Sequence, residues 1–127
     1  MARILIAEDE EAIRQLVARA LAQDGHQVIT ANDGAEALDV LIRERGAFEL
    51  LLTDIRMPVM DGIALALAAT RDYPALTILL MTGYADQRER AHGLDALIHD
   101  VVTKPFSLAT IRTAVGDALT AHAARTH

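Results

Sequence analysis

Five short apolar segments alternate along this chain with stretches whose apolar residues recur at helical spacing. The apolar segments have the composition of strands and cover 4–7, 27–30, 50–53, 77–81 and 101–103. Helices are expected near 13–21, 35–42, 63–72, 86–92 and 108–122, with Ser107 as the N-cap of the last. Because each return to the next strand passes through a helix, the strands are expected to pair in parallel. The pattern predicts a doubly wound α/β sheet with helices on both faces.

Length and composition are those of one folded domain. The 127 residues fall within the usual size of a domain, and 52% of them are hydrophobic. We expect the domain to cover 1–122, with 123–127 as a short C-terminal tail and no effector domain after it. The chain has no cysteine, which excludes disulfides and thiolate metal sites.

The net charge of −6 argues against binding to nucleic acid or to anionic lipid, because both need a cationic surface. The longest apolar run, 63–69, is too short to cross a bilayer. Acidic residues at 8–11 follow the first apolar run, where a signal peptide would not tolerate them. We therefore expect a cytoplasmic protein that does not insert into membranes.

Polar side chains stand where the predicted strands end. Glu8 and Asp9 follow the first strand, and Asp54 follows the third. Thr82 ends the fourth strand, and Lys104, the only lysine in the chain, follows the fifth. Each of these residues alone has an ordinary structural explanation, such as helix capping or solvation. The carboxyl ends of parallel strands share one edge of the sheet, however, so these side chains are expected to converge there.

Such a cluster of acids needs a counter-charge. Three carboxylates within about 5 Å of one another repel by roughly 3 kcal/mol per pair at an effective dielectric constant near 20. Lys104 offsets one charge, and the remainder suits Mg²⁺, which prefers oxygen ligands and completes its shell with water and phosphate oxygens. A carboxylate beside such an ion, with an ammonium and a hydroxyl group opposite, can accept a phosphoryl group as an acyl phosphate.

Four motifs, in this order, resemble the receiver domains of two-component response regulators. They are Glu8-Asp9, the segment 54–62 (DIRMPVMDG), Thr82-Gly83 and Lys104-Pro105-Phe106. The resemblance extends over essentially the whole chain. It implies a CheY-like, flavodoxin-like fold, in which a five-stranded parallel sheet of order 2-1-3-4-5 carries five helices.

The resemblance also implies the roles of the acidic residues. Asp54 matches the residue that is phosphorylated. Asp9 and Asp54 match the Mg²⁺ ligands, with the backbone carbonyl of Arg56 as a third ligand. Glu8 matches an acidic residue that assists through water.

Further roles follow from the other motifs. Thr82 matches the hydroxyl residue that moves on activation, and Lys104 matches the lysine that pairs with the phosphoryl group. Pro105 matches a proline whose preceding peptide bond is cis. Asp61-Gly62 matches the turn after the acceptor loop, where glycine is expected to relax the backbone.

The chain departs from the family pattern at position 101. Many receivers carry an aromatic residue there, which swings inward when the threonine moves, and this chain has Val101. We hypothesise that Tyr84 takes over part of this switching or gates the phosphate, the alternative being a surface tyrosine that packs on the nearby helix.

The Arg56 side chain can overhang the phosphoryl group and either shield it from water or admit water. Val101 and the segment 82–85 (TGYA) resemble the CpdR type of single-domain regulator, which acts by protein contact in regulated proteolysis.

These features predict a phosphorylation switch that catalyses only its own phosphorylation and dephosphorylation. A histidine kinase or histidine phosphotransfer protein is expected to dock near the first helix. A downstream protein target is expected, as a proteolysis adaptor or as a flagellar or phosphorelay intermediate, and the chain is expected to be a monomer or a phosphorylation-dependent dimer. The predicted output surface comprises the fourth helix, the fifth strand and the fifth helix. It includes Arg88, Arg90, His99 and Arg112.

Three alternative functions make different demands on the sequence. A Mg²⁺-dependent phosphatase with an aspartate nucleophile would need a second aspartate where this chain has Arg56. A flavin or nucleotide binder would need a Gly-rich or Ser/Thr-rich loop after the first strand, where the chain is acidic instead. A pure scaffold is distinguished by offering a small phosphodonor with Mg²⁺, since a scaffold takes up no phosphoryl group.

Overall fold

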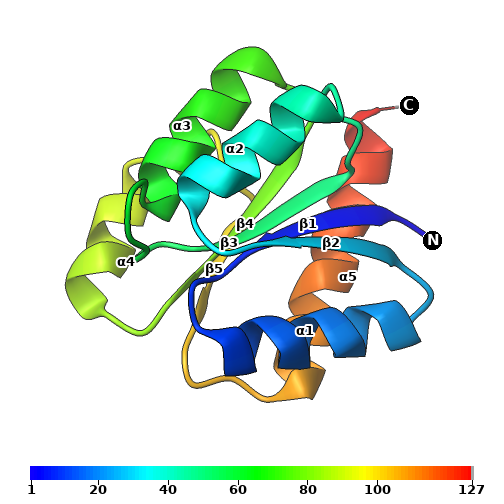
Figure 1. Cartoon of the computed structure of the whole chain (residues 1–127), viewed down its shortest axis with the longest axis horizontal. Coiled ribbons are helices and arrows are strands. Elements are labelled where there is room, and N and C mark those ends of the chain that lie inside the picture. The colour runs from blue at the N-terminus through cyan, green and yellow to red at the C-terminus, as the bar shows by residue number, and fades with distance from the viewer. Residues whose placement is uncertain (127) are drawn as a thin grey trace.

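A single five-stranded sheet runs through the computed structural model, which describes residues 1–126 (Figure 1). Its strands are β1 (Arg3–Ala7), β2 (Gln27–Ala31), β3 (Leu50–Asp54), β4 (Thr77–Thr82) and β5 (Asp100–Thr103). All neighbouring strands are parallel, and their order is β2-β1-β3-β4-β5. The predicted fold class and strand order are confirmed.

Five helices connect and follow the strands. They are α1 (Glu11–Gln23), α2 (Gly34–Arg43), α3 (Gly62–Asp72), α4 (Ala85–His92) and α5 (Leu108–Arg125). Three begin at a side chain that accepts a hydrogen bond from the backbone amide three residues later. These caps are Asp33, Asp61 and Ser107.

The last helix extends beyond its predicted end at residue 122 and reaches Arg125. Alanine is the best helix former, and the alanines at 121, 123 and 124 allow the helix to continue after its apolar stripe ends. The Arg125 guanidinium also donates a hydrogen bond to the Ala75 carbonyl, 3.2 Å away, just before β4. Most of the predicted tail is therefore helical, and its residue 127 lies outside the described residues.

Alternating side chains of the strands build one core on each face of the sheet. On β1, Leu5 packs into the core beneath α2, α3 and α4, whereas Ile4 and Ile6 pack into the core beneath α1 and α5. Figure 1 shows the same division of the helices between the two faces. Every residue of β3 and β4 is buried, as expected for central strands covered on both sides.

The chain reverses direction across the sheet between β1 and β3, which are neighbours although β2 separates them in sequence. In open α/β sheets the crevice at such a point, outside the carboxyl ends of the strands, is where ligands bind.

Within residues 1–126, no helix combines the length and the apolar character needed to span a membrane.

Candidate functional site

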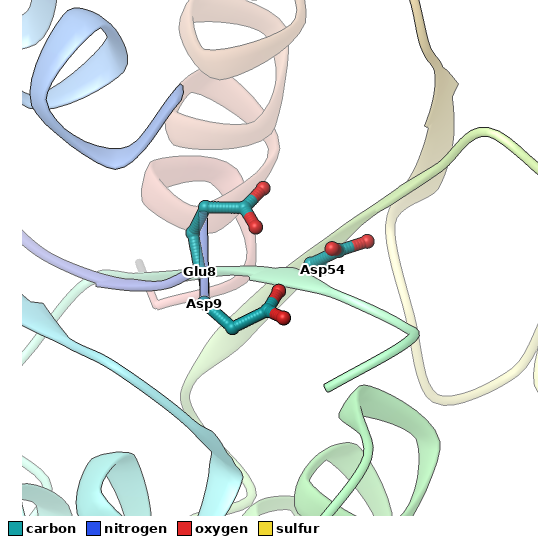
Figure 2. A group of neighbouring side chains, drawn as sticks. All are labelled: Glu8, Asp9 and Asp54. Atoms are coloured by element: carbon teal, nitrogen blue, oxygen red, sulfur yellow. The ribbon is translucent and has the colours of Figure 1, made fainter. Parts of the chain in front are cut away.

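Three carboxyl groups gather where β1 and β3 end. One oxygen of each of Glu8, Asp9 and Asp54 lies within 4.8 Å of the others. The pairing of β1 with β3 brings these residues together, and Figure 2 shows Glu8 and Asp9 extending toward the side on which Asp54 lies. Glu8 is fully buried and Asp54 is 6% exposed, whereas Asp9 is exposed.

Lys104 supplies the positive charge within this cluster. Its Nζ lies 2.6 Å from Glu8 Oε1 and 3.1 Å from Asp54 Oδ2. Its backbone amide donates to the Thr82 carbonyl at 2.7 Å, which anchors the loop after β5, and the Lys104–Pro105 peptide bond is cis. The direct contact between Lys104 and Glu8 was not anticipated from the sequence.

Burial governs the protonation of this cluster. Loss of solvation raises the pKa of Glu8 to about 7, although the hydrogen bond from Lys104 opposes the rise. Burial likewise raises the pKa of Asp54 against the opposing charge of Lys104. For Lys104, burial alone would lower the pKa, but the hydrogen bond to Glu8 and the charge of Asp54 outweigh it and raise the pKa. Lys104 therefore stays charged, and the acids remain under-compensated.

The cluster suits a hard divalent cation. All its donor atoms are carboxylate oxygens, and Mg²⁺ binds such oxygens in preference to nitrogen or sulfur. One ammonium group does not balance the three carboxyl groups once they are ionised, so a second cation placed there lowers the electrostatic free energy of the ionised cluster. The three acids of the cluster thus fit the predicted ion.

Thr82 ends β4 beside the cluster and is 1% exposed. Its hydroxyl accepts a hydrogen bond from the Tyr84 amide at 3.1 Å and lies 3.5 Å from the Tyr84 carbonyl. Among residues 1–126, this hydroxyl forms hydrogen bonds only to the backbone of Tyr84. Thr82 therefore lies on the strand beside Asp54, one position past the Asp54 register partner Met81, and its hydroxyl is engaged with the start of α4.

Tyr84 and Arg56 lie together at the mouth of the site. Tyr84 occupies the N-cap position of α4 and is 49% exposed. The guanidinium carbon of Arg56 lies 4.9 Å from the centre of its ring, a cation–π distance. Val101 is half-buried on β5, where it pairs with Leu80. The contact between Arg56 and Tyr84 carries no signal in the sequence, because it joins side chains of two different loops.

Gly62 is required for close packing. A Cβ atom at this position would lie 2.0 Å from the carbonyl oxygen of Asp54, and the Gly62 amide donates to the Ile55 carbonyl at 2.7 Å. The expectation that this glycine relaxes the backbone is therefore replaced by a steric reason. The neighbouring Asp61 caps α3 by accepting a hydrogen bond from the Ala64 amide at 2.8 Å.

A cavity of about 600 Å³ opens over Asp54. Asp9, Asp54 and Lys104 line it together with apolar side chains of α1 and of the loop after β5. Leu16 is one of these and is 52% exposed. Its position in the apolar pattern of the helix would instead suggest a buried side chain. The other apolar side chains of this part of the lining are Ile13, Pro105 and Phe106.

Two residues of the predicted output surface are engaged elsewhere. Arg112 forms an ion pair of 3.1 Å with Asp24, just after α1, so its side chain is directed away from α4 and β5. Arg90 on α4 lies 3.4 Å from Asp61, the cap of α3. Arg88 and His99, in contrast, line a small cavity beside β5.

Comparison with known sequences identifies one family. Residues 4–116 match the model of the response regulator receiver domain. The response regulator MprA of Mycobacterium leprae is 38% identical over 106 residues, which are 84% of this chain and 46% of MprA. MprA of Mycobacterium tuberculosis strain H37Rv is 37% identical over 84% of this chain and 45% of its own. The chain thus spans less than half the length of these relatives.

Solved structures show the same fold. A CheY-like receiver domain protein from Methanospirillum hungatei superposes with a TM-score of 0.89 at 27% identity, covering 98% of each chain. The response regulator TrrA of Thermotoga maritima, in complex with Mg²⁺ and BeF, superposes with a TM-score of 0.82 at 29% identity. That superposition covers 93% of this chain and 99% of TrrA.

Proposed function

This chain belongs to the response regulator receiver domain family, and on that premise we propose that it is a phosphorylation switch whose acceptor is Asp54. The position of Asp54 carries the proposal. Its carboxylate borders a cavity, lies 3.1 Å from Lys104, and has two further acids within 4.8 Å. Receiver domains take phosphate from histidine kinases, so the phosphodonor is phosphohistidine on a kinase or a phosphotransfer protein. We propose residues 1–122 as the receiver domain, with the last helix continuing past this boundary to Arg125.

The transfer forms one bond and breaks another. An Oδ atom of Asp54 attacks phosphorus, the O–P bond forms, and the P–N bond to the donor histidine breaks. The bonding electrons stay on the imidazole nitrogen, which takes up a proton. Dephosphorylation ends the signal. A water oxygen attacks phosphorus and the O–P bond to Asp54 breaks, which restores the Asp54 carboxylate and releases inorganic phosphate. The chain performs both reactions only on itself.

Asp9, Asp54 and the backbone carbonyl of Arg56 would hold Mg²⁺, with Glu8 assisting through water. Bound there, the ion would neutralise charge on the phosphoryl oxygens. The complex of TrrA with Mg²⁺ and BeF, at 29% identity, supports this choice of ion.

Lys104 and Thr82 are proposed to read the phosphorylation state. Lys104 would exchange part of its contact with the acids for a phosphoryl oxygen, and Thr82 would turn its hydroxyl from Tyr84 toward the same group. These contacts exist in only one of two conformations, so they shift the balance between them. Because Val101 is not aromatic, Tyr84 takes over part of the switching.

The apolar part of the cavity supports docking of the phosphodonor protein beside α1. Leu16 is exposed there and lines the same cavity as Phe106 and Asp54. We place the output surface on α4, β5 and the adjoining part of α5, with Arg88 and His99 beside β5. A downstream protein of the kind that CpdR-type regulators contact is the proposed target, with a flagellar or phosphorelay role as the alternative.

Incubation with Mg²⁺ and acetyl phosphate tests the proposal. We expect one phosphoryl group per chain by intact-protein mass spectrometry, none on Asp54→Asn, and normal loading of Asp72→Asn, which changes an exposed aspartate at the far end of α3. Continuous turnover of the donor at enzyme-like rates would instead indicate a phosphatase. A wild-type chain that takes up no phosphoryl group would overturn the proposal.

A further inference from the structure

Tyr84 is held at the mouth of the cavity through both its backbone and its ring. Its amide donates to the Thr82 hydroxyl at 3.1 Å. Its ring lies against the Arg56 guanidinium, whose carbon is 4.9 Å from the ring centre. Because the residue is 49% exposed, burial contributes little to fixing it.

Both groups that hold Tyr84 lie next to Asp54. Thr82 ends β4, and Asp54 pairs with the residue before it, Met81. Arg56 follows Asp54 by two positions and lines the same cavity.

The backbone around Arg56 is held in place, whereas the Arg56 side chain is exposed. The amide of the preceding residue, Ile55, donates to the Met81 carbonyl at 3.0 Å, and the side chains on either side, Ile55 and Met57, are buried. The Arg56 side chain itself is exposed, and within residues 1–126 it forms no ion pair with a carboxylate. Its charge is therefore available to an anion at Asp54 without the loss of a salt bridge.

We propose that a phosphoryl group on Asp54 takes both of these partners from Tyr84: Arg56 leaves the ring for the phosphoryl oxygens as Thr82 turns to the same group. This inference rests on the proposed role of Asp54 as the acceptor. A phosphoryl group carries nearly two negative charges, and hydrogen bonds from a guanidinium group to phosphate are stronger than its contact with an exposed aromatic ring.

The exchange has two consequences. The ring of Tyr84 loses its contact with Arg56 and the Tyr84 amide loses the Thr82 hydroxyl, and α4 is a short helix in which only Ala91 is buried, so its first turn is held by fewer contacts. Arg56, once over the phosphoryl group, stands in the path of the water that hydrolyses it. Phosphorylation thereby makes Tyr84 available to a partner, and the movement of Arg56 prolongs the lifetime of the phosphoryl group on Asp54.

Phosphoryl lifetimes in three variants test the exchange. After loading with acetyl phosphate and Mg²⁺ and removal of the donor, we expect Arg56→Ala to lose its phosphoryl group several-fold faster than the wild type. Tyr84→Ala is expected to retain it several-fold longer, because Arg56 no longer has a competing partner. The double variant should match Arg56→Ala, and Tyr84→Phe, which keeps the ring face, should restore the wild-type lifetime. Arg71→Ala, an exposed arginine paired with Asp72, is the matched control.

Opposite outcomes identify which proposal fails. If Tyr84→Ala changes the lifetime equally with and without Arg56, the two side chains act independently and the exchange does not occur. If the wild type takes up no phosphoryl group at all, the proposed function itself fails.

Beryllofluoride with Mg²⁺ allows the surroundings of the Tyr84 ring and of Arg56 to be measured directly. The chain has two tyrosines and no tryptophan, so a Tyr73→Phe background makes tyrosine fluorescence report on Tyr84 alone. We expect beryllofluoride to change this emission, and to remove the ring-current shift of the Arg56 Nε–H in NMR spectra assigned with Arg56→Ala. Beryllofluoride that binds at Asp54 and leaves both signals unchanged would overturn the exchange.

Discussion

Lys104 places its ammonium nitrogen 2.6 Å from Glu8, a carboxyl group that no solvent reaches. The two residues stand 96 positions apart in the chain. The same ammonium nitrogen lies 3.1 Å from Asp54 Oδ2, so Lys104 contacts both the buried acid and the proposed acceptor.

Replacing Glu8 should change how the stability of the metal-free protein depends on pH. Burial raises the pKa of Glu8 from 4.5 to about 7, so the unfolded chain releases this proton first as the pH rises. The group therefore lowers the free energy of unfolding between pH 4.5 and 7, by up to about 3 kcal/mol, with no further loss above that range. We expect Glu8→Gln to gain stability relative to the wild type from pH 5 to pH 7.5 in urea titrations with EDTA. Parallel pH profiles of the two proteins would contradict this account.

Removing the Lys104 side chain should separate phosphorylation from its consequences. Lys104→Ala leaves Glu8 and Asp54 without their cation, so we expect phosphorylation at least tenfold slower but still detectable by mass spectrometry. Retention of partners from a pull-down should no longer differ between beryllofluoride-treated and untreated protein, whereas it differs for the wild type. Intact beryllofluoride-dependent binding in the variant would show that Lys104 does not couple the two events.

Neutralising Asp9 should stabilise the apo protein and weaken the metal site. Asp9→Asn removes one of three like charges within 4.8 Å, so we expect the melting temperature in EDTA to rise by a few degrees. The affinity for Mg²⁺ in a titration should fall at least tenfold. Glu10→Gln, which neutralises the exposed neighbouring acid outside the cluster, is the control and should leave Mg²⁺ affinity nearly unchanged. A lower apo melting temperature for Asp9→Asn would count against repulsion within the cluster.

Two glycine substitutions should act in opposite directions. A Cβ at Gly62 would meet the Asp54 carbonyl oxygen at 2.0 Å, so Gly62→Ala is expected to destabilise by about 2 kcal/mol or more. Gly116 lies inside α5 with open space around it, so Gly116→Ala is expected to stabilise by about 0.5–1 kcal/mol. Urea denaturation measures both, and a neutral Gly62→Ala would show that the acceptor loop shifts freely.

The sequence by itself predicted the order of strands and helices and the edge of the sheet at which the polar residues meet. These properties are local: the period of the apolar residues marks each element, and an acid directly after a strand must stand at that strand's end. The predicted helix cap Ser107 belongs to the same class, because a cap acts on amides within its own turn.

Only the tertiary structure decided which polar residues are buried and which partners they meet. Glu8 and Asp9 are neighbours in the chain, yet the first is sealed beside Lys104 and the second faces solvent. Likewise, Arg56 lies against Tyr84, and Arg112 is paired with Asp24 rather than standing beside β5. Burial and pairing depend on how distant elements pack against each other, and the local pattern of residues does not contain that information.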